Sequence, residues 1–88
     1  MLHIALEDLE QAITSFQKAI NTNPPDSPNR TVTLNNLGNG LIDRYVYTAV
    51  LDDLQQAVTC YQKAVAGTRS GSPDLAGNLN NLGAGLRA

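Results

Sequence analysis

The sequence repeats itself over almost its whole length. A shift of 45 residues aligns 1–43 with 46–88 without a gap, and 18 of the 43 aligned pairs are identical. Average residue usage predicts about three identities, at roughly 6% per position. The most similar parts are two octamers, LNNLGNGL at 34–41 and LNNLGAGL at 79–86. A period of this length is typical of stacked structural units that cannot bury their apolar faces alone.

Each period contains two segments with the spacing of an amphipathic helix. In 7–20 and again in 52–65, apolar residues recur at i, i+3, i+4 and i+7. The octamers carry a second apolar stripe of leucines at helical spacing. No segment alternates as a strand would, so the pattern predicts an all-α chain of one small domain. The four expected helices span residues 6–21, 28–47, 51–66 and 73–87.

Two of these helices have matching start signals. Ser27 and Ser72 are suited to the N-cap, because a serine hydroxyl accepts a hydrogen bond from a free N–H of the first turn. Pro28 and Pro73 follow them at the first helical position, where a missing N–H does no harm. The sequence therefore predicts that both octamer helices start at these Ser-Pro pairs.

The composition excludes several classes of function. Six Lys and Arg residues against eight Asp and Glu give a net charge of −2, without a basic run. Binding to nucleic acid or to an anionic membrane is therefore not expected. The apolar runs are too short for a membrane span. A single cysteine and the absence of a signal-peptide pattern favour a cytoplasmic location.

The helix pair carries a recognisable motif. L-x-x-L-G-x-x-L at 34–41 is followed by A-x-x-x-Y-x-x-A at 57–64, and this combination resembles a tetratricopeptide repeat. The resemblance covers essentially all 88 residues. The stretch from PPDSPNR to LDDLQQAVTCYQKAV is similar to a subgroup with longer repeats, found in large arrays. The resemblance implies an α-solenoid of antiparallel helix pairs, with the second helix (B) of one repeat preceding the first helix (A) of the next, in the order B-A-B-A.

The resemblance also implies a function. Repeats of this family act as non-enzymatic scaffolds that bind a protein or peptide partner, and no cofactor is implied. The alternative is a purely structural repeat that assembles with itself and has no foreign ligand.

The octamer glycines need an explanation, since a glycine inside a helix costs about 1 kcal/mol relative to alanine. A phosphate-binding loop is excluded, because neither glycine pair follows a strand or precedes a Lys-Ser/Thr pair. Gly38 and its repeat equivalent Gly83 are instead expected to let the first helix approach the second closely, opposite its alanines. The expected packing motif comprises Leu37, Gly38, Ala57, Tyr61 and Ala64.

Asparagines mark the expected binding groove. In tetratricopeptide arrays the first helix of each pair lines the concave face, and an asparagine amide offers the donor and acceptor that an extended peptide backbone needs. For Asn36 and Asn81, bonding to neighbouring loops or helices stays open as a structural alternative. The candidate groove residues are Asn35, Asn36, Asn39, Asp43, Asn80, Asn81 and Arg87.

Neither a catalytic group nor a metal site is expected. His3 is the single histidine and lies at a terminus without a motif around it. Cys60 aligns with Ser15 on a helix face, so it is expected to be a partly packed small residue rather than a nucleophile. The acidic pairs at 7–8 and 52–53 point to different helix faces and suit the positive end of the helix dipole.

The link between the second and third segments departs from the resembled pattern. That subgroup usually has a Thr-Gly-Asp-Leu-like turn, but Thr48 is followed here by Ala-Val-Leu. Thr48 or Asp52 could still cap a new helix after a turn. The alternative is one long helix through 44–54 whose two halves pack against another chain.

Both ends of the repeat are apolar, where a neighbouring unit would normally pack. The chain is therefore expected to be a piece of a longer array or to associate with itself, as a closed dimer formed by end-to-end stacking or by a swap through 44–54. The apolar end residues are Leu2, Ile4 and Leu6 on one side and Leu79, Leu82 and Leu86 on the other.

Overall fold

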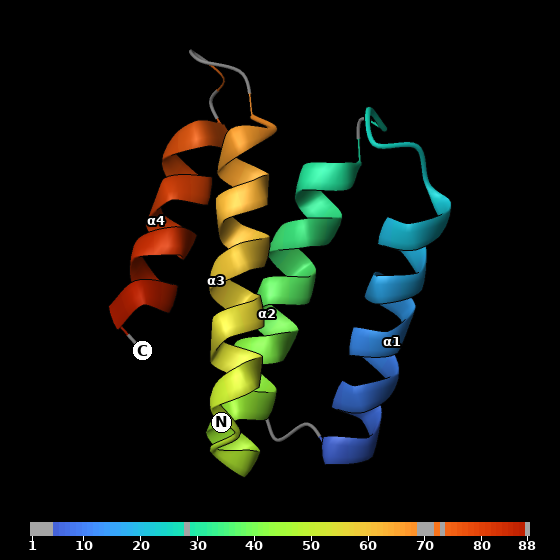
Figure 1. Cartoon of the computed structure of the whole chain (residues 1–88), viewed down its shortest axis with the longest axis vertical. Helices are drawn as coiled ribbons and strands as arrows, with labels where there is room; N and C mark the ends of the chain where they lie inside the picture. The colour runs from blue at the N-terminus through green and yellow to red at the C-terminus, as the bar shows by residue number, and fades with distance from the viewer. Residues whose placement is uncertain (1–4, 28, 69–71, 73, 88) are drawn as a thin grey trace.

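Four α-helices make up the computed structural model, which describes residues 5–27, 29–68, 72 and 74–87. They are α1 (Leu6–Thr22), α2 (Arg30–Thr48), α3 (Leu51–Ala66) and α4 (Asp74–Arg87). Helix α2 packs between α1 and α3, and α4 packs on α3 and touches α2. Helices α1 and α4 lie at opposite ends of this row (Figure 1). No strand occurs in the described ranges, and the predicted all-α class is confirmed.

The core lies along α2, which packs on α1 at one side and on α3 at the other. Its members come from the predicted stripes, because residues three and four apart share one helix face. Full burial of a leucine or isoleucine side chain stabilises the fold by roughly 2 kcal/mol. From α4, Leu82 packs against this core while partly exposed. The buried hydrophobic residues are Leu9, Ile13, Leu34, Leu37, Leu41, Ala57, Cys60, Tyr61 and Ala64.

The chain turns between α2 and α3 and does not continue as one helix. Ala49 adopts a left-handed conformation, with φ 56° and ψ 24°, and its N–H donates to the Tyr45 carbonyl at 2.7 Å. The Thr48 hydroxyl accepts a hydrogen bond from the N–H of Val50, at 3.3 Å. Val50 is the N-cap of α3 and makes no side-chain cap bond. The prediction that Thr48 or Asp52 caps α3 is therefore wrong, and the N–H of Asp53 donates instead to the Val50 carbonyl, at 3.1 Å.

Helix α2 begins two residues later than predicted. The N–H of Arg30 donates to the Ser27 carbonyl at 3.0 Å, which forms a separate turn before the helix. Asn29 is the N-cap and makes no side-chain cap bond. The predicted N-cap role of Ser27 is therefore wrong. Pro28, its expected first helical residue, lies outside the described residues.

The start of α4 contains the cap bond that was predicted from the sequence. The hydroxyl of Ser72 accepts a hydrogen bond from the N–H of Asp74 at 3.2 Å. An N-cap serine satisfies one of the free donors of the first turn in this way. Pro73 lies outside the residues that the structure describes.

An ion pair joins α2 to α3 next to their turn. The guanidinium of Arg44 donates two hydrogen bonds to the carboxylate of Asp53, at 2.9 and 2.8 Å. Asp53 is only 5% exposed, and its hydrogen bond raises the pKa of Arg44. The first-turn position of Asp53 predicts only an interaction with the helix dipole, and this ion pair is an additional contact. A signal was present, since Asp53 lies four residues before buried Ala57 on the same face of α3.

Candidate functional site

Tyr61 of α3 sets the spacing between α2 and α4. A Cβ added to Gly38 would lie 2.5 Å from Cε1 of the Tyr61 ring, and one added to Gly85 would lie 3.0 Å from Cδ2. Both octamer helices therefore approach this ring through a glycine. The atoms nearest to a Cβ at Gly38 belong to the Tyr61 ring, so Gly38 faces the tyrosine rather than an alanine.

Gly83, the repeat equivalent of Gly38, has no such contact. A Cβ added there would meet only Nη1 of Arg87, at 3.3 Å, among the described atoms outside its own helix backbone. The prediction that Gly83 lets its helix approach a second helix is wrong within the described chain. No described helix packs on α4 in the way that α3 packs on α2.

The hydroxyl of Tyr61 orients Asn39, one of the predicted groove residues. It donates a hydrogen bond to Oδ1 of Asn39 at 2.6 Å. Burial, together with the negative charge of Asp43, raises the pKa of Tyr61 to about 12, so the hydroxyl keeps its proton and acts as a donor. The amide nitrogen of Asn39 has no hydrogen-bond partner in the described part of the chain, and Asn39 is exposed.

A chain of side-chain amides joins α2 to α4. Nδ2 of Asn35 donates to Oδ1 of Asn78, and Nδ2 of Asn78 donates to the Thr68 hydroxyl at 2.6 Å. Nδ2 of Asn81 approaches Oδ1 of Asn35 at 3.5 Å, which is a long bond. Asn78 is 6% exposed, so these bonds satisfy polar groups that burial would otherwise leave unpaired. Asn35 and Asn81 therefore help to hold the two octamer helices together.

Two hollows lie along the surface between α2 and α4. The upper one lies near the start of α4 and has a volume of about 360 Å³. It is lined by Asn36 and Asn80, which are both exposed and have no side-chain hydrogen bond to the described residues. The lower one, of about 240 Å³, is lined by Asn39 and Asp43. Asn81 lines both hollows, so together they form one continuous face. We call this surface the asparagine face.

Most of the predicted groove residues meet on the asparagine face. The structure places six of the seven there, namely Asn35, Asn36, Asn39, Asp43, Asn80 and Asn81. Arg87 lines neither hollow, because its guanidinium lies beside Gly83 on another side of α4.

The acidic and amide side chains of the face include two that were not predicted. Asp74 and Asn78 both line the upper hollow. Their spacing from Asn81, at i−7 and i−3, places all three on one side of a helix. The internal repeat does not reveal these two residues, because Asn78 aligns with Thr33 and Asp74 with Asn29.

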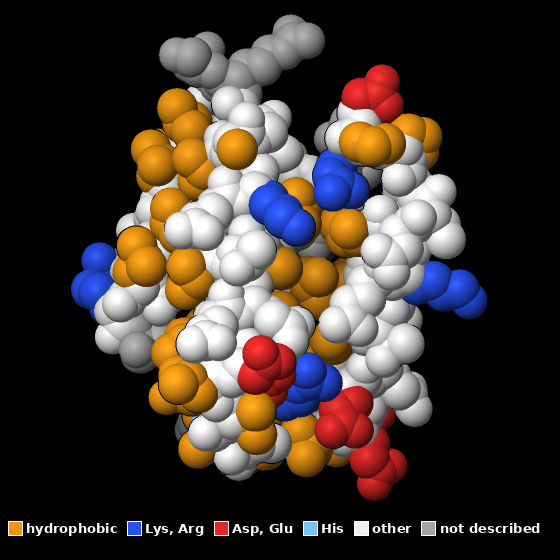
Figure 2. Space-filling view, viewed as in Figure 1, with side chains coloured by type: hydrophobic (Ala, Val, Ile, Leu, Met, Phe, Trp, Pro, Cys, Tyr) orange, Lys and Arg blue, Asp and Glu red, His pale blue; other side chains and the backbone are white. Residues whose placement is uncertain are grey.

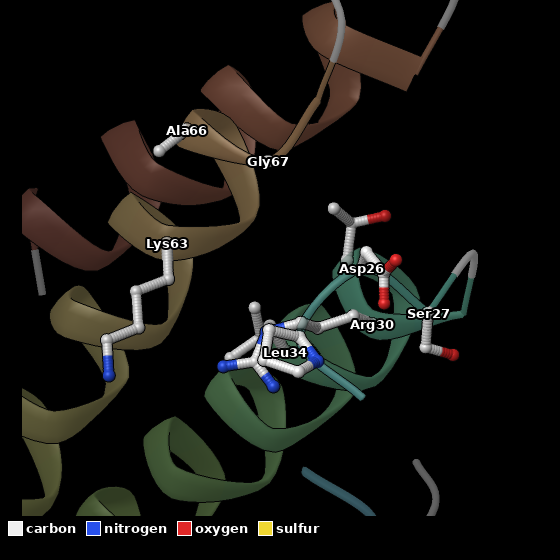
Figure 3. Close-up of a pocket in the computed structure, with 9 residues that line it drawn as sticks. Asp26, Ser27, Arg30, Leu34, Lys63, Ala66 and Gly67 are labelled. Carbon is white, nitrogen blue, oxygen red and sulfur yellow. The ribbon is translucent and has the colours of Figure 1, made fainter. Parts of the chain in front are cut away.

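A larger hollow lies on another side of the molecule. Its volume is about 770 Å³, and none of the predicted groove residues lines it. It is lined by α2, by the end of α3 and by the loop before α2. Figure 2 shows Lys and Arg side chains beside hydrophobic ones on this side of the molecule. Lys63 extends from α3, while Arg30 and Leu34 extend from α2 (Figure 3). Nη1 of Arg30 donates to the Ile20 carbonyl at 3.4 Å, so this cation is already engaged by the end of α1.

The remaining candidates for chemistry are inert or undescribed. Cys60 is 8% exposed, and burial raises the pKa of its thiol, which keeps it protonated and unreactive. No group of three His, Cys, Asp or Glu residues that could hold a metal ion occurs in the described ranges. His3 lies outside them. None of the helices described here is both long enough and apolar enough to cross a membrane.

The fold and the asparagine face define a helical-repeat protein, built from antiparallel pairs that meet through glycine and aromatic contacts. Residues 31–74 match a tetratricopeptide repeat family model, and residues 1–26 match a second one. The chain therefore belongs to the tetratricopeptide repeat family. No curated protein and no solved structure matches it. Repeats of this family are in general protein–protein interaction modules and typically have no enzymatic activity.

Proposed function

We propose that the asparagine face binds an extended peptide segment of a partner protein. The observation that carries this proposal is the pair Asn36 and Asn80, whose exposed amides line the upper hollow without a described protein partner. Each amide presents a donor and an acceptor, which match the C=O and N–H of a peptide in extended form. The free amide nitrogen of Asn39 in the lower hollow adds a third donor along the same line.

The charges of the face favour one class of peptide. Asp74 lines the upper hollow and Asp43 the lower one, whereas no Lys or Arg lines either of them. We therefore propose a partner segment with basic or neutral side chains. A C-terminal carboxylate has no cation to bind here. Because the contacts go mainly to the peptide backbone, binding should tolerate many sequences, with a Kd in the micromolar range.

A titration with two sets of extended peptides tests this function. One set carries lysine at alternate positions and the other carries glutamate, and the lysine set should bind more tightly. In the double variant Asn36→Ala/Asn80→Ala, affinity should fall roughly 10- to 30-fold, since each net hydrogen bond contributes about 1 kcal/mol.

The matched control removes two exposed amides from other helices. Asn21 of α1 and Gln62 of α3 are exposed and line none of the hollows described above. The double variant Asn21→Ala/Gln62→Ala should bind as the unchanged chain does. Equal affinity of the Asn36/Asn80 variant and the unchanged chain would show that the peptide does not bind to this face.

A further inference from the structure

We propose that copies of this chain join head to tail, with α1 of one copy docking antiparallel on α4 of the next. Helix α4 is the sequence repeat of α2, and α1 is the repeat of α3. The interface between α2 and α3 is buried within each chain. A second copy can therefore build the same interface again between the two outer helices, which lie at opposite ends of the molecule (Figure 1).

On α4, the residues that would form this interface are uncovered. Leu34 and Leu41 of α2 are 3% and 0% exposed, but their repeat equivalents Leu79 and Leu86 are 47% and 64% exposed. Gly83 lies between these leucines on the same stripe and has no aromatic ring against it. The exposed stripe on α4 is thus the repeat equivalent of the surface of α2 that α3 covers, but here it is uncovered.

On α1, the matching residues are also less buried than their equivalents. Ala57, Tyr61 and Ala64 of α3 are 0%, 3% and 0% exposed, while Ala12, Phe16 and Ala19 of α1 are only partly buried. Ser15 is exposed, whereas its equivalent Cys60 is 8% exposed. Among the described helices, α1 packs against α2 alone, so this side has no covering partner. These less buried positions of α1 are therefore the ones whose repeat equivalents on α3 face α2.

One polar contact of the α2–α3 pair is lost on both uncovered surfaces at once. The Tyr61 hydroxyl needs Asn39 as its acceptor. The repeat equivalent of Tyr61 on α1 is Phe16, which has no hydroxyl, and the equivalent of Asn39 on α4 is Ala84, which has no acceptor. A Phe16 ring placed against Gly83 would therefore leave no polar group unpaired. This double change fits α1 of a second copy as the occupant.

Charge also selects this occupant and its direction. Helix α4 begins with Asp74 and ends with Arg87, while α1 has Asp8 in its first turn and Lys18 near its end. Antiparallel docking places Arg87 beside Asp8, which is the repeat equivalent of the ion-paired Asp53. Parallel docking would instead place like charges together, which is unfavourable. None of these four side chains has an ion pair within the described chain.

This contact joins two different surfaces, so it does not close on itself. Each added copy leaves one α1 and one α4 uncovered, and a contact of this kind grows into open chains unless its rotation closes a ring. The expected product is a concentration-dependent series of oligomers rather than a dimer alone.

Two variants test the interface through complementation. Ser15→Lys places a charge on the docking side of α1, and Leu86→Asp places one on the docking side of α4. Both residues are exposed in the single chain, so neither change should disturb its fold. In sedimentation velocity, the unchanged chain should form larger species as concentration rises, and each variant alone should stay monomeric. An equimolar mixture of the two should form a dimer, because each retains the surface that the other has lost.

Thr14→Lys is the matched control. Thr14 is exposed on α1 but points away from the docking side, so this variant should assemble as the unchanged chain does. Circular dichroism checks that all variants remain helical. A wild-type chain that stays monomeric at every concentration would contradict the proposal. So would assembly of Ser15→Lys alone, which would point to pairing of α4 with α4. Peptide binding by the asparagine face is a separate property and is measured independently of these outcomes.

Discussion

Gly38 and Gly83 occupy the same position in the two repeats but have different surroundings. Gly38 is buried under the Tyr61 ring, whereas Gly83 meets only the tip of a flexible arginine. The sequence showed that glycine at this position needs a packing reason. It could not show which copy has a neighbour, because that depends on which helices are adjacent in space.

Replacing Gly38 with alanine should destabilise the fold, although alanine is the better helix former. The added Cβ would clash with a buried ring, and such overpacking costs typically 1–3 kcal/mol. Gly77 is the matched control, since a Cβ there would meet no described atom within 4 Å outside its own stretch of helix backbone. Gly77→Ala should stabilise the chain by up to about 1 kcal/mol. The free energy of unfolding in urea measures both effects, and a Gly38→Ala variant as stable as Gly77→Ala would contradict the tight contact.

Stability should fall at high pH because of Tyr61. Its folded-state pKa is raised from 10.0 to about 12, so the folded chain holds this proton more tightly than the unfolded chain. The stabilisation is fully present below pH 10 and is lost as the pH rises to about 12, by an amount on the order of 2 kcal/mol. Unfolding experiments across this range measure the loss. Tyr61→Phe has no proton to lose, so its stability should depend less on pH; an identical dependence would contradict this assignment.

At the scale of helices, the turn and the ion pair next to it decide how α2 and α3 meet. Ala49 adopts the left-handed conformation that glycine prefers, and it is the one non-glycine residue with positive φ among those described. Its place in the chain coincides with the glycine of the resembled Thr-Gly-Asp-Leu turn. The turn therefore persists without its glycine, at a cost of roughly 1 kcal/mol.

Ala49→Gly should remove this cost and stabilise the chain by about 1 kcal/mol. Ala84, an exposed residue inside α4, is the control. Ala84→Gly should destabilise the chain by about 1 kcal/mol, because it loosens a helix interior. Thermal unfolding of the two variants should thus shift in opposite directions. A lower melting temperature for Ala49→Gly would mean that the turn does not have this conformation in solution.

Asp53 and Asp52 are neighbours in sequence, but only Asp53 is buried with an ion-pair partner. Asp53→Asn leaves the Arg44 guanidinium without its carboxylate and should cost about 2 kcal/mol, less than for a fully buried pair because Arg44 remains 24% exposed. Asp52→Asn changes an exposed residue and should stay within about 0.5 kcal/mol. Urea unfolding compares the two, and equal effects would show that the ion pair does not hold the helices together.

The sequence was sufficient for the helices but not for all of their ends. Apolar spacing over four segments is a strong signal, since it repeats twice and has no competing strand pattern. The cap at Ser72 was foreseen from the Ser-Pro pair, but the same pair at Ser27 lies in a turn before α2. At both places the serine carbonyl accepts a hydrogen bond from the N–H three residues later, so the Ser-Pro pair alone does not decide whether the hydroxyl also caps the helix.

At the scale of the whole molecule, the row of helices explains what the repeat could and could not predict. The resemblance indicated that the octamer helices share one face, and six of the seven predicted residues lie there. It could not show that Asn35 bonds to Asn78, because this contact joins positions that differ between the repeats. The same row leaves α1 and α4 each with one uncovered side. Binding of a peptide and contact between copies therefore use different surfaces.

The location of a bound peptide tests the central claim most directly. Nuclear magnetic resonance of the isotope-labelled Ser15→Lys variant, chosen because it should stay monomeric, gives a signal for each backbone and side-chain amide. Addition of the lysine-bearing extended peptides should shift the side-chain amide signals of Asn36, Asn39 and Asn80 most strongly. Shifts centred on Arg30, Leu34 and Lys63 would instead place the peptide in the larger hollow between α2 and α3, and would contradict the proposal that the asparagine face is the binding site.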